Sequence, residues 1–184
     1  MRMFLLLIFI TGIFLTSCSC SESDMGAPVV NGNSVPMFEM ANNLGCSFLS
    51  DARSDMDMEG GCLVYPDYYG GMYIDADSVL VVLVVGNDSA CRRDVLERCK
   101  DSGFELRLCT YSMNYIRDVS DSISNVGTDV LKGLKVYYWG IDEERNRLLV
   151  MTGDVSEENV NNFKAVVMDS PVIEFCKSTP VDFY

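Results

Sequence analysis

The sequence predicts an α+β fold in which two tandem β-β-α-β units, joined by a helix, form a two-layer domain of helices against a sheet. A block of sequence recurs at a spacing of 67 residues, for example from Ile74 to Ile141, and such a period indicates a repeated structural unit. Each copy combines apolar runs of strand length with a segment of helical apolar spacing. With 48% apolar residues the chain can also bury a core.

The repeat places the units at about residues 65–110 and 134–177, within a single domain spanning residues 34–184. Between the units, residues 111–125 have apolar side chains at helical spacing and predict a connecting helix. The positions that match between the copies are Asp75 with Asp142, Ser89 with Ser156, Leu96 with Phe163, Leu106 with Ile173, and Cys109 with Cys176.

Each copy opens with an aromatic strand, at residues 71–75 and 136–142, followed by a polar turn whose Asp and Asn residues suit a hairpin. The next strand, at 79–85 or 147–152, is almost wholly apolar in the first copy, which favours a central position. With both copies in one mainly antiparallel sheet, we expect the segments around Leu80 and Leu148 to be paired neighbours.

A helix follows each hairpin, with Ser89 or Ser156 as its N-cap, and acids at Glu157 and Glu158 complement the second helix dipole. The expected apolar stripes are Val95, Leu96 and Cys99 in the first helix, and Val160, Phe163, Val166 and Val167 in the second. Closing strands at 104–109 and 172–176 should run parallel to the preceding strands. Upstream, Pro36 predicts the first turn of a helix over residues 34–44.

The N-terminus has the order of a signal peptide: Arg2, an apolar run over residues 3–10, and small residues before Cys18. The sequence Leu-Thr-Ser-Cys at 15–18 resembles the bacterial lipobox, which predicts a signal peptide at 1–17, acylation of Cys18 and a polar tether at 18–33. Several acyl chains would hold the protein firmly on a membrane. We therefore expect a cell-envelope location, on the outer membrane or cell surface, with ordinary cleavage and secretion as the alternative.

The chain is strongly acidic, with a formal net charge of −13, and this charge disfavours nucleic acid as a partner. Six of the 8 cysteines fall after the tether, and two interpretations stay open for them. They pair as disulfides in an oxidising compartment, or they are small buried apolar side chains.

The absence of histidine excludes serine–histidine and cysteine–histidine dyads, and serine and cysteine nucleophiles usually depend on an imidazole base. No cysteine spacing in the folded part predicts a zinc site, and we expect no cofactor. An acidic run, Asp51, Asp55, Asp57 and Glu59, has calcium-binding chemistry without a matching loop motif, so a solvated loop is favoured. Asp75 and Asp142 could form a carboxylate pair, but capping of equivalent hairpin turns is the favoured role.

Two segments resemble the pro-regions of secreted bacterial chymotrypsin-like proteases, the α-lytic protease and streptogrisin group. The first is Tyr-Pro-Asp-Tyr-Tyr-Gly-Gly-Met-Tyr-Ile-Asp at 65–75 with the apolar strand after it. The second is Gly-Ile-Asp at 140–142 followed by Asn-Arg-Leu-Leu-Val at 146–150. The resemblance implies a pro-region fold and a non-catalytic module that chaperones or inhibits a protease. The chain departs from that family in lacking the protease itself.

The same resemblance implies that the C-terminal tail contacts the active-site cleft of such a protease. The tail consists of Thr179, Pro180, Val181, Asp182, Phe183 and Tyr184, and Pro180 biases the residue before it toward an extended backbone. The alternative is that these residues pack back on the domain. The leading hypothesis is thus an anchored protein-binding module for an extracellular protease. A structural or adhesion lipoprotein and a carboxylate-based enzyme are the other two.

Overall fold

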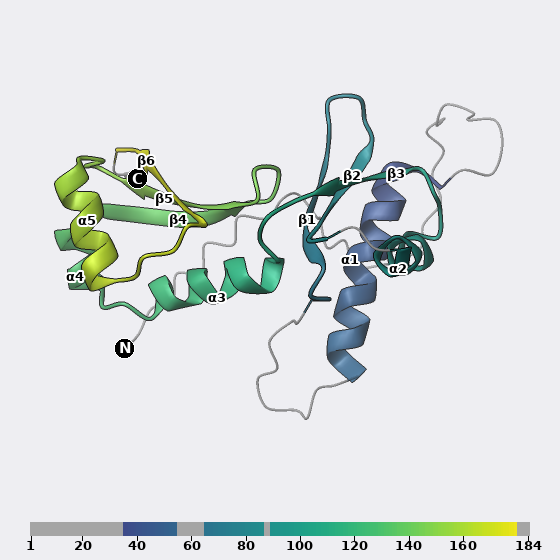
Figure 1. The fold of residues 1–184 in the computed structure, drawn as a ribbon, viewed down its shortest axis with the longest axis horizontal. Coiled ribbons are helices and arrows are strands. Elements are labelled where there is room, and N and C mark those ends of the chain that lie inside the picture. The colour runs from purple at the N-terminus through teal and green to yellow at the C-terminus, as the bar shows by residue number, and fades with distance from the viewer. Residues whose placement is uncertain (1–34, 55–64, 87–88, 180–184) are drawn as a thin grey trace, which may run out of the picture. The chain divides into compact units, whose positions relative to one another are not determined.

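The computed structural model describes residues 35–54, 65–86 and 89–179, which belong to one unit, Ser34–Tyr184 (Figure 1). In chain order the elements are α1 (Met37–Ser54), β1 (Tyr69–Ile74), β2 (Leu80–Val84), α2 (Ser89–Cys99), β3 (Phe104–Leu108), α3 (Met113–Ser124), α4 (Thr128–Gly133), β4 (Val136–Asp142), β5 (Arg147–Thr152), α5 (Glu157–Val166) and β6 (Ile173–Lys177). The predicted α+β class with two tandem β-β-α-β units is confirmed.

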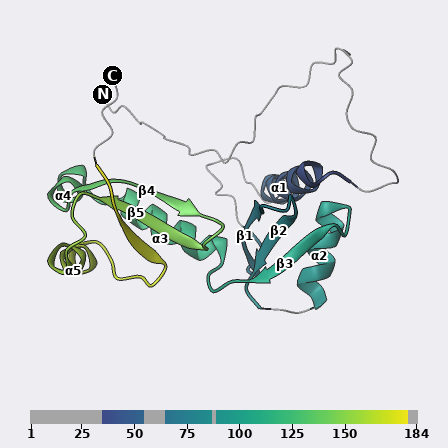
Figure 2. The same cartoon turned by 90° about the horizontal axis from the view of Figure 1, so that it is seen from above.

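The first unit is a three-stranded sheet in the order β1-β2-β3, with β1 antiparallel and β3 parallel to the central β2. All five residues of β2 are buried, as its unbroken apolar character predicts. On one face Leu80, Val82 and Val84 pack with residues of α1 and α2, and Figure 2 shows these helices beside the sheet. Sheet and helices therefore form two layers.

The second unit repeats this order as β4-β5-β6, again with one antiparallel and one parallel pair. Leu148 and Val150 of β5 face a core that includes Phe163 of α5 and Ile116 of α3. Alternate residues of β5 are only half-buried, so one face of this sheet meets the helices and the other does not.

The expectation of one mainly antiparallel sheet is wrong, because the two units form separate sheets. Leu80 and Leu148 are not on paired neighbouring strands: each lies in the central strand of its own sheet. In both units the first and third strands flank the central one, so neither β2 nor β5 has a free edge on which the other could pair. Each sheet is also mixed, with one antiparallel and one parallel pair.

Strand register corrects the sequence match between the two closing strands. Leu80 pairs with Phe104, whereas Leu148 pairs with Ile173. Phe104 is therefore the structural counterpart of Ile173, two residues before the Leu106 that the sequence match proposes. As a result Cys109 and Cys176 are not equivalent, because Cys176 lies inside β6 opposite Met151 and Cys109 follows the end of β3.

The helices follow their predicted positions with differences in length and in the buried residues. α1 runs to Ser54, ten residues beyond the predicted end, and buries Met40, Leu44 and Phe48. The short helix α4 was not predicted. In α2 the buried residues are Cys91, Val95 and Cys99, while Leu96 is 41% exposed. In α5 only Phe163 is buried, and the predicted stripe residue Val166 is 62% exposed.

The Ser156 cap and the turn conformations agree with the sequence pattern, whereas Ser89, predicted as an N-cap, is the first residue of α2. The Ser156 hydroxyl accepts a hydrogen bond from the Asn159 amide, and both predicted acids lie in the first turn of α5. Asn146 has the left-handed φ of 53° that a hairpin turn needs, and in the first hairpin Ser78 takes this conformation at 62°. None of the helices within the described ranges is long and apolar enough to span a bilayer.

The turn between β4 and β5 holds the two units together. The side chain of Asn146, only 4% exposed, donates to the carbonyls of Gly70 and Tyr111 at 3.0 and 2.8 Å. Its Oδ1 accepts from the Tyr111 amide at 2.9 Å. Gly70 belongs to β1 and Tyr111 to the link between the units. The Asn146 amide group therefore forms hydrogen bonds with three backbone groups from two other segments of the chain.

Helix α3 reinforces this joint, because its side chains enter both cores. Met113 packs in the first core, whereas Ile116, Val119 and Ile123 pack in the second. At its N-terminal end Asn114 exchanges two hydrogen bonds with the backbone of Tyr65, at 2.9 and 2.8 Å. A connecting helix thus becomes a shared structural element of both units.

Replacing Asn146 by glycine tests the joint, since glycine keeps the left-handed backbone and removes the side chain that carries the amide group. We expect Asn146→Gly to lower the free energy of unfolding by about 2–4 kcal/mol, because buried backbone groups lose their partners. Chemical denaturation provides the measurement. The matched control is Ser78→Gly at the exposed left-handed position of the other hairpin. Equal effects of the two variants would contradict the proposed role of the amide.

Four cysteines, Cys46, Cys99, Cys109 and Cys176, are free thiols, so none of these four contributes a disulfide to the fold. Of the two interpretations left open by the sequence, a small buried apolar side chain fits Cys99 in α2, which is 0% exposed. Burial, with a smaller contribution from the Asp101 carboxylate, raises the pKa of Cys99 to about 11.

These environments predict a clear order of thiol reactivity. Cys46 is exposed, so iodoacetamide at mildly alkaline pH should modify it in the native protein, while Cys99 stays unmodified because it is buried and protonated. Peptide mapping by mass spectrometry measures both, and protein unfolded in urea, where Cys99 should react, is the control. Modification of native Cys99 as fast as Cys46 would contradict the structure.

Candidate partner-binding surface

The face of the first sheet that points away from its helices is covered by the protein's own side chains. Arg107 of β3 reaches across the central strand: its Nη1 donates to the Tyr73 hydroxyl of β1 at 2.6 Å, and the guanidinium lies 5.8 Å from the centre of that ring. It also pairs with Asp75 and Glu105. Beneath this network Val81 and Leu83 are 0% and 4% exposed.

The same face of the second sheet has no such cover. The register makes Gly140 the counterpart of Tyr73, and Cys176 the counterpart of Arg107. Neither side chain can span the central strand. Leu149 and Met151, the counterparts of Val81 and Leu83, are left partly exposed. With the neighbouring Tyr138 and Cys176 they form a surface that we call the open patch: Tyr138, Leu149, Met151 and Cys176.

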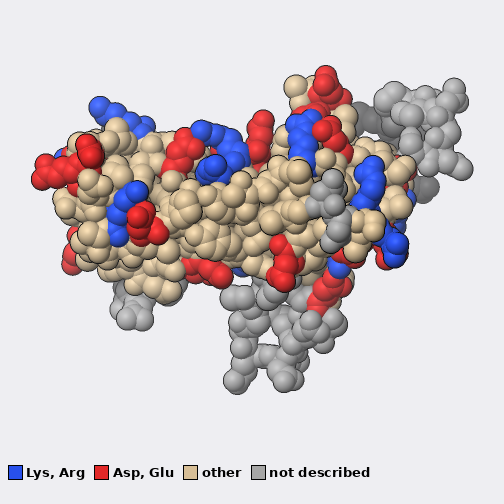
Figure 3. All heavy atoms as spheres, viewed as in Figure 1, with Lys and Arg blue, Asp and Glu red and all other residues tan. Residues whose placement is uncertain are grey.

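Ion pairs lie at both ends of the strands that carry the open patch. Arg145 and Glu174 pair at 2.6 Å, and Lys135 pairs with Asp154 at 2.8 Å. Figure 3 shows charges of both signs dispersed over one face of the molecule, separated by uncharged surface. An apolar centre with a polar rim is the usual composition of a protein-binding surface.

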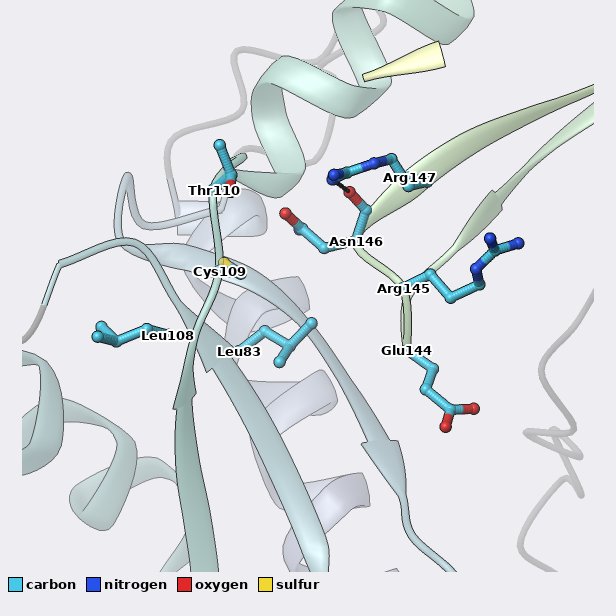
Figure 4. Close-up of a pocket in the computed structure, with 8 residues that line it drawn as sticks. All are labelled: Leu83, Leu108, Cys109, Thr110, Glu144, Arg145, Asn146 and Arg147. Atoms are coloured by element: carbon cyan, nitrogen blue, oxygen red, sulfur yellow. Dashed lines mark hydrogen bonds between the residues drawn. The ribbon is translucent and has the colours of Figure 1, made fainter. Parts of the chain in front are cut away.

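A small pocket lies where the β4–β5 turn meets the first unit. It measures about 200 Å³ and is lined by the turn residues Glu144, Arg145, Asn146 and Arg147 together with Leu83 of β2, Leu108 of β3, Cys109 and Thr110 (Figure 4). The Arg147 guanidinium donates to the Asn146 carbonyl and lies over the Tyr111 ring at 5.1 Å. Because its polar groups serve the joint, we assign this pocket a structural role.

The C-terminal tail begins at an edge strand of the second sheet. After β6, the Ser178 amide donates to the Thr152 carbonyl at 2.8 Å, and Thr179 is exposed. The other tail residues predicted to contact a partner, Pro180, Val181, Asp182, Phe183 and Tyr184, lie outside the described residues. So does Cys18. Their predicted roles remain predictions.

The carboxylates considered for catalysis have structural roles instead. Asp75 accepts hydrogen bonds from the amides of Val79 and Asp77, and these bonds, with the Arg107 charge, hold the pKa of Asp75 below its usual range. Asp142 caps its own turn by accepting from the Arg145 amide. Both therefore cap the hairpin turns, as predicted. A carboxylate whose oxygens are held by hydrogen bonds within its own turn is poorly placed to act as a general acid.

The acidic run is only partly within the described ranges. Asp51 lies in the last turn of α1 and pairs with Arg98 of α2 at 2.6 Å, whereas Asp55, Asp57 and Glu59 lie outside the described residues. Across the described ranges, no cluster of three or more candidate ligands could hold a metal ion.

The fold and the surface together define a class of two-unit α+β proteins with a connecting helix and an open face on the second sheet.

Comparison with known families gives this class a name. Residues 34–109 match the model of the Pro-like N-terminal domain, and residues 113–178 match the model of the Pro-like C-terminal domain. The chain therefore belongs to the Pro-like family and carries its two domains in order, consistent with a protease pro-region. The resemblance indicated by the strand motifs is confirmed. A search of curated proteins found no match.

Sequence reasoning missed the open patch, because the patch depends on strand register. The tail and Cys18 are predicted from local sequence alone, and their roles stay predictions. In contrast, the covering role of Arg107 appears only when β3 is aligned with β1 across the central strand. A signal was nevertheless present. In the second copy, Leu149 and Met151 alternate with the buried residues of β5. In the first copy, the residues that cover the central strand are a tyrosine and an arginine, Tyr73 and Arg107.

Proposed function

We propose that this protein is a non-catalytic, envelope-anchored binding module for an extracellular chymotrypsin-like serine protease. The observation that carries the proposal is the pair of Pro-like domain matches, since pro-region domains are generally non-catalytic. The partner would lie against the open patch, and the tail after β6 would run along the active-site cleft.

The geometry of the second unit supports this choice of surface. The open patch and the start of the tail belong to the same sheet, because Cys176 of β6 is three residues before Thr179. A partner on the patch would therefore meet the tail without any rearrangement of the domain. An extended segment can bind in a protease cleft through main-chain hydrogen bonds, and the proline in the tail favours an extended backbone at Thr179.

The partner prediction is tested with the chain lacking residues 1–18 and the chymotrypsin-like proteases that its source organism secretes. We expect binding and inhibition, and deletion of residues 180–184 should weaken inhibition by about tenfold or more, equivalent to roughly 1.4 kcal/mol. Leu149→Glu should also weaken binding, because it places a charge in the open patch. Inhibition assays and calorimetry provide the measurements.

The matched control is Leu108→Glu, which adds the same charge at an apolar side chain that is 67% exposed on the first sheet. This variant should bind like the wild type. Absence of binding to every such protease would contradict the proposal. Equal losses of affinity for Leu149→Glu and Leu108→Glu would exclude the open patch as the contact surface.

Anchoring is a separate part of the proposal, motivated by the lipobox-like residues 15–18. Cys18→Ser should abolish incorporation of a labelled fatty acid and move the protein from the membrane fraction to the soluble fraction, because the acylated thiol is lost. Cys20→Ser, two residues away, is the control and should retain both label and location. A labelled, membrane-bound Cys18→Ser protein would contradict the anchor.

A further inference from the structure

Strand β3 forms an edge of the first sheet. It lies last in the order β1-β2-β3, and among the described residues no strand pairs with its outer side. Just after β3, the Cys109 amide donates to the Val84 carbonyl of β2 at 2.9 Å. Backbone polar groups alternate in direction along a strand, so every second residue before Cys109 also points toward β2. The residues between them direct their amide and carbonyl groups to the outer edge: Phe104, Leu106 and Leu108.

The side chains of β3 alternate between apolar and charged. Phe104 and Leu106 pack in the first core on the helix side of the sheet. Glu105 and Arg107 lie on the opposite face and pair with each other at 2.7 Å. The strand thus has the order apolar, acidic, apolar, basic, apolar, with one charge of each sign at equal distances from the central Leu106.

This order makes the edge complementary to itself in one register. If two β3 strands pair antiparallel with Leu106 opposite its own equivalent, Glu105 of each copy lies opposite Arg107 of the other. These would be the non-hydrogen-bonded positions, where opposing side chains are closest. Shifting one strand by two residues instead places glutamate opposite glutamate or arginine opposite arginine, and like charges directly opposite are destabilising.

The same register covers an exposed apolar side chain. Leu108 is 67% exposed, and Figure 4 shows its side chain directed away from Leu83. In the paired strands it would lie opposite Phe104 of the second copy. There, Phe104 and Leu96 line a pocket of about 300 Å³ between α2 and the start of β3. Leu108 of each copy therefore has an apolar surface to pack against.

The equivalent edge of the second sheet lacks this complementarity. Glu174 of β6 is the counterpart of Glu105 in the register, but Cys176 takes the place of Arg107. Two β6 strands paired about Phe175 would place each Glu174 carboxylate opposite a thiol. The charge pattern therefore singles out β3.

We propose that the outer edge of β3 is a self-association surface, through which two copies of this chain form a symmetric dimer. The three-stranded first sheets join across a twofold axis at Leu106, and each copy supplies the same groups to the contact. The dimer uses no residue of the open patch and does not depend on a protease partner.

The test is sedimentation equilibrium of the chain lacking residues 1–18, which keeps every described element, with a reductant to prevent disulfides through exposed thiols. We expect a reversible monomer–dimer equilibrium. Glu105→Arg places an arginine opposite Arg107 of the second copy and should raise the dimer dissociation constant by about tenfold or more. Glu174→Arg, the same change at the matching position of β6, is the control and should leave the constant unchanged.

A mixture of two variants tests the pairing itself. Arg107→Glu should also fail to dimerise alone, whereas its mixture with Glu105→Arg restores opposite charges at both positions and should form heterodimers. If Arg107→Glu fails to fold, Leu108→Lys replaces it in the measurement on single variants and should weaken the dimer, because it sets a charge against the apolar pocket of the second copy.

Hydrogen exchange locates the contact in the wild type. The Leu106 amide, which points outward, should exchange more slowly as the protein concentration rises, while the inward Arg107 amide should not change. A protein that stays monomeric at every concentration would overturn the proposal and leave the edge to a strand of another protein. Equal weakening by Glu105→Arg and Glu174→Arg, or Leu106 exchange that does not depend on concentration, would overturn it as well.

Discussion

The insertion of the β4–β5 turn against the first unit is the contact on which the rest of the structure depends. Asn146 has a left-handed backbone and a buried amide that bonds to Gly70 and to both polar groups of Tyr111. An isolated three-stranded sheet with one or two helices is a small folding unit. By bonding one hairpin to the other unit, and by sharing α3 between two cores, the chain makes one larger body from two small ones.

The two copies have diverged in how they treat the outer face of their sheets. In the first copy, Arg107 and Tyr73 cover Val81 and Leu83, so the apolar side chains on that face are buried within the protein. In the second, Gly140 and Cys176 leave Leu149 and Met151 partly exposed. An apolar patch that the same fold covers elsewhere is a reasonable place for a partner. The Pro-like family assignment makes a protease the leading candidate.

Local features of the fold could be predicted from sequence because they depend on near neighbours. The hairpins, the Ser156 cap, the left-handed Asn146 and the apolar face of α3 all follow from patterns a few residues long. The split into two sheets could not be predicted in this way, since periodicity does not say which strands pair. The equivalence of Phe104 with Ile173 likewise required the register, and with it the covering role of Arg107.

The central claim is that the two Pro-like units behave as one body in solution. Residual dipolar couplings of the backbone amides measure this directly, since each rigid body has its own alignment tensor. For residues 65–109 and 113–178 we expect a single shared tensor that fits both sheets. Two tensors of different magnitude or orientation would show that the units tumble separately, and would contradict the account.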